Sequence, residues 1–151
     1  GTNDKVENDA KSHYQIGEPI LGDMHERMRV NMSFTKEHAM RKDRIEINDE
    51  DRAIIKTLVD RCDSKHVLIT HGSDSMVATA RSLTNISGKC IVLTGALQPA
   101  AFANSDAVFN IGCAIGALQS KDSGVYIAMN GQIFDANHVQ KNVAANRFES
   151  I

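Results

Sequence analysis

The chain has 151 residues, of which 42% are hydrophobic and 24% charged, which is the balance of one compact domain. Its 17 Lys and Arg residues against 19 Asp and Glu residues leave a formal net charge of -2, and no basic stripe that would follow a nucleic-acid backbone is present. No apolar run approaches the roughly 20 residues that cross a bilayer, and the N-terminal segment is too polar for a signal peptide. We therefore expect a soluble, cytoplasmic protein with neither nucleic-acid nor membrane partners.

The cysteines and histidines do not form ligand patterns. Cys62, Cys90 and Cys113 are odd in number and widely spaced, which fits neither a disulfide framework nor a zinc site, so we interpret them as small core residues. The histidines are scattered, and His71 has no second histidine or carboxylate at ligand spacing. The sequence predicts no metal and no cofactor.

The first fifty residues carry weak structural signals. Residues 3–20 contain Gly17 and Pro19 and are typical of an exposed loop, whereas residues 28–34 alternate between apolar and polar types as a strand does. Asn48 can cap a helix that continues to about Cys62 and carries one apolar stripe.

From there on, short β-rich runs alternate with helical patterns, which is typical of right-handed βαβ units. Strands are predicted over 66–70 and 90–95, a helix follows each of them at about 76–83 and 105–118, and a tight Asn-Gly hairpin is predicted over 125–134. In the second of these helices Val108 is expected to face inward and Ser105 to be the cap. The fold class is α/β: a three-layer αβα arrangement with a mostly parallel sheet, plus a C-terminal β-hairpin.

A polar pentapeptide, HGSDS, follows the strand predicted over 66–70. Ligands of open parallel sheets bind at the carboxyl ends of the strands, and hydroxyls beside a carboxylate can bind an ammonium group there. Ser and Asp are also ordinary helix caps, so plain capping remains an alternative interpretation of this motif.

Four blocks in order give a further indication. The stretches HVLITHGSDSMVATA, IVLTGALQPA, SDAVFNIG and GVYIAMNGQIFDANHVQKN together resemble the N-terminal domain of the bacterial asparaginase/glutaminase family, in particular its short single-domain members. The resemblance runs from Gly1 to the end of the chain. It implies one domain over residues 1–151, with the family's first strand apparently missing before residue 1.

The resemblance also assigns roles to individual residues. Thr2 matches the nucleophilic threonine of the family, and Tyr14 matches a tyrosine on the flexible loop that follows it. Ser73 and Asp74 match the second hydroxyl and its acidic partner, and Lys141 matches the lysine that completes the catalytic set. An alcohol needs such a base, because it is a weak nucleophile at neutral pH.

Substrate-binding positions follow from the same motifs. Asp74, with Ser73 and Gly72, is expected to pair with the α-ammonium group of an amino acid. Arg44 replaces a serine that binds the substrate carboxylate in the family; its guanidinium can bind that carboxylate or fill the pocket. Asn3 replaces an apolar residue, and Ser73 and Ser75 replace threonines.

We therefore expect an amidohydrolase that converts L-asparagine to L-aspartate and ammonia through a threonine acyl-enzyme, as a homodimer or homotetramer. One methylene discriminates by only about 1 to 3 kcal/mol, so the preference between asparagine and glutamine stays open. The alternative is a non-catalytic amino-acid-binding or interaction module that kept the fold while its site eroded. Ammonia release, compared with an asparagine-induced shift in melting temperature, distinguishes the two.

Overall fold

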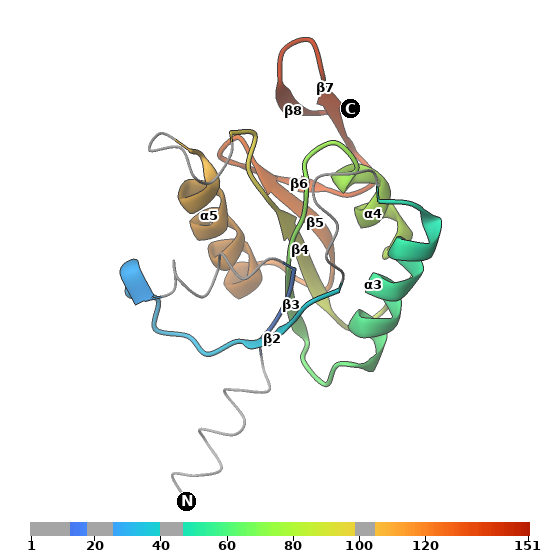
Figure 1. Cartoon of the computed structure of the whole chain (residues 1–151), viewed down its shortest axis with the longest axis vertical. Coiled ribbons are helices and arrows are strands. Elements are labelled where there is room, and N and C mark those ends of the chain that lie inside the picture. The colour runs from blue at the N-terminus through green and yellow to red at the C-terminus, as the bar shows by residue number, and fades with distance from the viewer. Residues whose placement is uncertain (1–12, 18–25, 40–46, 99–104) are drawn as a thin grey trace, which may run out of the picture.

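A central sheet between two layers of helices forms the body of the protein. The computed structural model describes residues 13–17, 26–39, 47–98 and 105–151 (Figure 1). The strands are β1 (His13–Ile16), β2 (Thr35–Glu37), β3 (His66–Thr70), β4 (Cys90–Thr94), β5 (Gly124–Met129), β6 (Gln132–Asp135), β7 (Val139–Asn142) and β8 (Arg147–Ser150). The helices are α3 (Asp49–Arg61), α4 (Met76–Ser82) and α5 (Ala107–Ser120).

The main sheet has the strand order β2-β1-β3-β4-β5-β6. All neighbouring strands are parallel except the last pair, β5 and β6, which is antiparallel. Strands β7 and β8 form a second, two-stranded antiparallel sheet that projects from the body as an arm (Figure 1). The predicted three-layer αβα class with a mostly parallel sheet is thereby confirmed.

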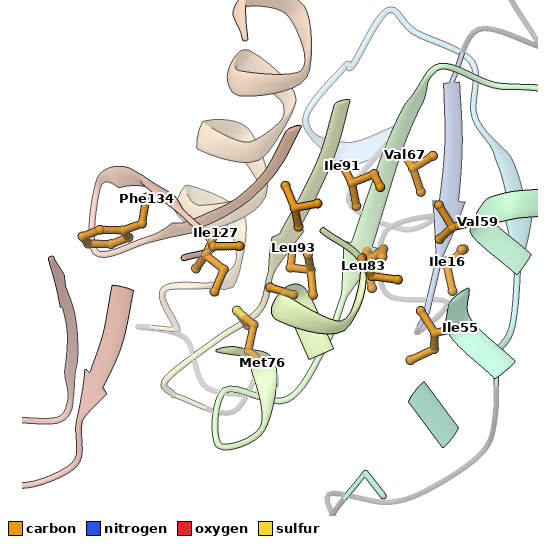
Figure 2. Packing of buried hydrophobic residues seen from close by; sticks show 14 of the residues in the cluster. Ile16, Ile55, Val59, Val67, Met76, Leu83, Ile91, Leu93, Ile127 and Phe134 are labelled. Carbon is orange, nitrogen blue, oxygen red and sulfur yellow. The ribbon is translucent and has the colours of Figure 1, made fainter. Parts of the chain in front are cut away.

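Helices cover both faces of the sheet, so the central strands are apolar on both sides. On one face α3 and α4 bury the side chains shown in Figure 2, among them Ile55, Val59 and Met76, against Ile91 and Leu93 of β4. On the other face α5 packs on alternate residues of the same strands, which are Leu68, Cys90, Val92 and Ala128. Alternation with period two assigns the buried apolar residues of β3, β4 and β5 to one or the other of the two clusters.

Local sequence signals account for two of these elements. Asn48 caps α3 in a capping box, in which its side chain accepts from the Asp51 N–H and the Asp51 carboxylate accepts from the Asn48 N–H. Asn130 and Gly131 join β5 to β6 with φ angles of 54° and 71°. Positive φ at both central residues is characteristic of the type I′ turn that suits a two-residue hairpin.

Three predictions about local structure are wrong. Residues 28–34 do not form a strand: Val30, Met32 and Phe34 pack against the cluster beneath α5, so their alternation reflects burial without a partner strand. Residues 13–16 were expected in an exposed loop, but they form β1, which pairs with β2 and β3 and buries Ile16 completely. Val108 is 41% exposed rather than facing inward.

The cysteines and the start of α5 match the sequence predictions only in part. All three cysteines are free; Cys90 is buried as predicted, whereas Cys62 and Cys113 lie half-buried beside the two clusters. The N-cap of α5 is Asp106, and the Ser105 hydroxyl accepts from the Ala107 N–H. None of the helices in the described ranges is long and apolar enough to cross a membrane.

Candidate active site

The loop of residues 71–75 connects β3 to α4 at the carboxyl end of the sheet. The backbone N–H of His71 donates to the carbonyl of Thr94 over 2.9 Å, which ties the loop to the end of β4. Gly95 lies so close beneath it that an added Cβ would be 2.1 Å from the His71 carbonyl oxygen. A side chain at position 95 would therefore push the loop out of place, which is why the close approach requires glycine.

The structure brings together three of the predicted site residues, Ser73, Asp74 and Lys141, although the aspartate and the lysine lie 67 positions apart in the sequence. Lys141 Nζ donates to Ser73 Oγ over 3.0 Å and to Asp74 Oδ1 over 2.7 Å. The Lys141 side chain is 13% exposed, whereas that of Asp74 is 93% exposed. An ammonium group has three donors, so one N–H remains for a ligand beyond these two contacts.

Helix capping does not explain the polar residues of this loop. Ser75 is the N-cap residue of α4, but its side chain makes no capping hydrogen bond. The side chains of Ser73 and Asp74 turn instead to Lys141. The alternative of plain capping is therefore wrong for these two residues.

His71 supports the loop from within. Its Nδ1 lies 2.7 Å from the Gly72 carbonyl oxygen, and its Nε2 lies 2.9 Å from the hydroxyl of the buried Thr79. Because a carbonyl only accepts, Nδ1 carries the proton and Nε2 accepts from the Thr79 hydroxyl. Burial lowers the pKa of His71 and so favours this neutral form, although the hydrogen bond to the Gly72 carbonyl offsets the effect in part. These contacts give His71 a structural role in the loop.

Lys141 reaches the site from the β7–β8 arm. Val139 and Phe148 attach the arm to the core, with exposed fractions of 0% and 1%. Phe148 is the register partner of Lys141, and its N–H donates to Asn130 Oδ1 over 2.7 Å. Arg81 of α4 binds the chain just before Lys141. No pattern in the sequence points to these contacts of Asn130 and Arg81, because both side chains bind backbone groups that only the folded chain brings near.

Tyr14 is engaged elsewhere. Its side chain lies in the buried strand β1, opposite Val67, and its hydroxyl donates to the Glu37 carboxylate. Burial, together with the hydrogen bond and charge of Glu37, raises the pKa of Tyr14, so the hydroxyl stays protonated. The expected loop position is thus wrong, because the residue is held inside the sheet, and the structure does not bring Tyr14 to Lys141.

Of the remaining predicted site residues, only Gly72 lies in the described part of the chain. Gly72 is exposed and its carbonyl accepts from His71. Thr2 and Arg44 lie outside the described residues, as does Asn3. Within the described part of the chain, no three His, Cys, Asp or Glu side chains converge in a way that could hold a metal ion.

A doubly wound α/β domain with a hydroxyl, a carboxylate and an ammonium group gathered at the carboxyl ends of its strands defines the class of protein. Comparison with known proteins then gives the family. The model of the asparaginase N-terminal domain matches residues 2–151, so the chain belongs to the asparaginase family.

Individual relatives agree with this assignment. The chain is 34% identical over 94 residues to the glutaminase-asparaginase of Acinetobacter glutaminasificans, a match that covers 59% of this chain and 28% of that protein. It is 34% identical over 93 residues to L-asparaginase 2 of Escherichia coli, covering 58% and 26% of the two chains. The crystal structure of a probable cytoplasmic L-asparaginase from Campylobacter jejuni superposes with a TM-score of 0.79 at 27% identity, covering 93% of this chain and 50% of that one. The chain thus spans about half or less of the length of these relatives.

Proposed function

We propose that the protein hydrolyses the side-chain amide of L-asparagine to L-aspartate and ammonia, with Thr2 as the nucleophile. One observation carries the proposal: in a member of the asparaginase family, Lys141 is held between Ser73 and Asp74 at the carboxyl edge of the sheet. An amine that contacts both a hydroxyl and a carboxylate is suited to activate an alcohol for acyl transfer.

The proposed reaction has two halves. After the Lys141 ammonium group has released one proton to solvent, the Thr2 oxygen attacks the amide carbon and its proton passes to the neutral amine, either directly or through the Ser73 hydroxyl. In the tetrahedral intermediate the amino group takes up the transferred proton and leaves as ammonia, and an ester remains on Thr2. Water then attacks the ester in the same way, which releases aspartate and restores the threonine.

Substrate binding uses the exposed side of the cluster. The Asp74 carboxylate is 93% exposed and has a free side for the α-ammonium group of an amino acid, which a simple amide lacks. We propose Arg44 as the partner of the α-carboxylate, because a guanidinium binds carboxylates in a bidentate manner. The backbone of Gly72, beside Ser73, is open to a ligand. A Cβ added at Gly72 would have no neighbouring atom within 4 Å, so the space beside this residue is empty.

The test is ammonia release from L-asparagine and L-glutamine by the full-length protein, by Thr2→Ala and by Thr57→Ala. Thr57 is an exposed threonine on α3 and serves as the matched control. We expect activity in the wild type and the control and its loss in Thr2→Ala. A silent wild type whose melting temperature rises with asparagine would instead support the binding-module alternative and overturn the enzymatic proposal.

Assembly and location belong to the same proposal. We propose a homodimer or homotetramer, which light scattering during size-exclusion chromatography tests directly. A cytoplasmic location is supported by the name of the Campylobacter jejuni relative, and fractionation of cells that express the full-length protein tests it.

A further inference from the structure

Helix α4 is connected both to the loop that carries Ser73 and Asp74 and to the chain segment that carries Lys141. The loop with Ser73 and Asp74 leads directly into the first residue of the helix, Met76. Arg81, near the other end of the helix, reaches the chain that carries Lys141. A single helix of seven residues therefore links the loop with Ser73 and Asp74 to the backbone that supports Lys141.

The contacts of Arg81 are specific. Its Nε donates to the carbonyl of Ala136 over 3.1 Å, and its Nη2 donates to the carbonyl of Val139 over 3.0 Å. Ala136 and Val139 are completely buried and delimit the turn between β6 and β7. The forked guanidinium thus holds both ends of this turn at once, through two separate nitrogen atoms in one rigid plane.

The distance along the chain from this clamp to the ammonium group is short. Val139 precedes Lys141 by two residues in β7, so the two side chains lie on the same face of the strand. Strand β7 is paired only with β8 in the described structure and lies outside the main sheet. A displacement at the Val139 carbonyl would therefore reach Lys141 with few intervening contacts to absorb it.

We propose that Arg81 is a positioning residue of the active site: by clamping the carbonyls of Ala136 and Val139 to α4, it sets the contact of Lys141 with Ser73 and Asp74. This role rests on the proposed function for its catalytic consequence, but its geometric part does not. The hydrogen bond of Asn130 to the N–H of Phe148 holds the opposite strand of the arm in the same sense. Arg81 acts through the backbone and has no contact with substrate.

The kinetic test compares Arg81→Met with Arg81→Lys and with Arg147→Met in the full-length protein. Arg147 lies on the same arm, its side chain is 61% exposed and its guanidinium pairs with Glu149, so it is the matched control. We expect kcat for asparagine to fall about tenfold to a hundredfold in Arg81→Met with KM within about threefold, because small misplacements of a reacting group cost this much. Arg81→Lys, which keeps a cationic donor but loses the planar fork, should recover part of the loss, and Arg147→Met should behave as wild type.

A double variant distinguishes positioning from general damage. If Arg81 acts through Lys141, then Arg81→Met combined with Lys141→Met should have the same kcat as Lys141→Met alone. Losses that multiply would mean that Arg81 acts on the enzyme by another route and would overturn the proposal. Equal kcat in Arg81→Met and wild type would overturn it as well.

An activity-independent readout separates this proposal from the proposed function. Brief reductive methylation followed by peptide mass spectrometry measures how readily the Lys141 amine reacts, with the exposed Lys65 as internal reference. We expect Lys141 to react several times faster in folded Arg81→Met or Arg81→Lys than in the wild type. Faster labelling in a protein without amidohydrolase activity would refute the enzymatic function and support the clamp, whereas unchanged labelling in both variants would refute the clamp.

Discussion

Lys141→Met should separate catalysis from stability. The substitution keeps the unbranched stem, which is largely buried, and removes the ammonium group with its contacts at 3.0 Å to Ser73 and 2.7 Å to Asp74. The pair with Asp74 contributes at most about 1 kcal/mol to folding, because that carboxylate is 93% exposed and screened by water. The hydrogen bond to Ser73 adds about 1 kcal/mol, which relief of the buried charge offsets in part. We expect the free energy of unfolding to change by about 1 kcal/mol or less.

The effect on the proposed reaction is much larger. Loss of a general base costs about a hundredfold to ten-thousandfold in rate, equivalent to about 3 to 5 kcal/mol of activation free energy. Urea unfolding measures the first quantity, and ammonia release at saturating asparagine measures the second. The control is Lys65→Met, which removes an exposed lysine ahead of β3. A variant with kcat within tenfold of wild type, or one destabilised by more than about 3 kcal/mol, would refute the reasoning.

Three further predictions concern residues around the sheet. Tyr14→Phe removes the hydrogen bond to Glu37, so the free energy of unfolding in urea should fall by about 1 kcal/mol while kcat stays within a few-fold of wild type. A hundredfold loss of kcat would show instead that the hydroxyl leaves Glu37 to act in the reaction. Burial lowers the pKa of His71 below its ordinary value of 6.5, so the unfolded chain binds the proton more tightly and the melting temperature should fall as the pH drops below 6.5; His71→Gln should be less sensitive over that range, and an equal slope in both proteins would contradict this. At Asp106, burial alone would raise the carboxyl pKa, but hydrogen bonds headed by the Leu97 N–H outweigh it and lower the pKa; Asp106→Asn should therefore lose about 1 to 3 kcal/mol in urea unfolding at pH 7, and an unchanged midpoint would show that these bonds contribute nothing.

The sequence predicted the parts of the fold that depend on local signals. The cap at Asn48, the apolar run at β3 and the Asn-Gly turn after β5 each act over a few residues, and the structure has the expected element at each place. The same reasoning failed for residues 13–16, because a four-residue strand with polar Gln15 is stabilised by its neighbours β2 and β3 rather than by its own pattern.

The same distinction between local signals and long-range contacts applies to the candidate site. The residue types Ser73, Asp74 and Lys141 could be recognised from motifs, since their chemistry is written in the side chains themselves. Their grouping was implied only by the resemblance to the family and by no local pattern, because it joins a loop of the main sheet to an arm that begins more than sixty residues later. The sequence by itself determined which chemical groups are available and which strands and helices carry them. Only the tertiary structure decided that Lys141 meets Asp74 while Tyr14 meets Glu37, because long-range contacts depend on how strands and helices pack together, and local periodicity carries no information about that.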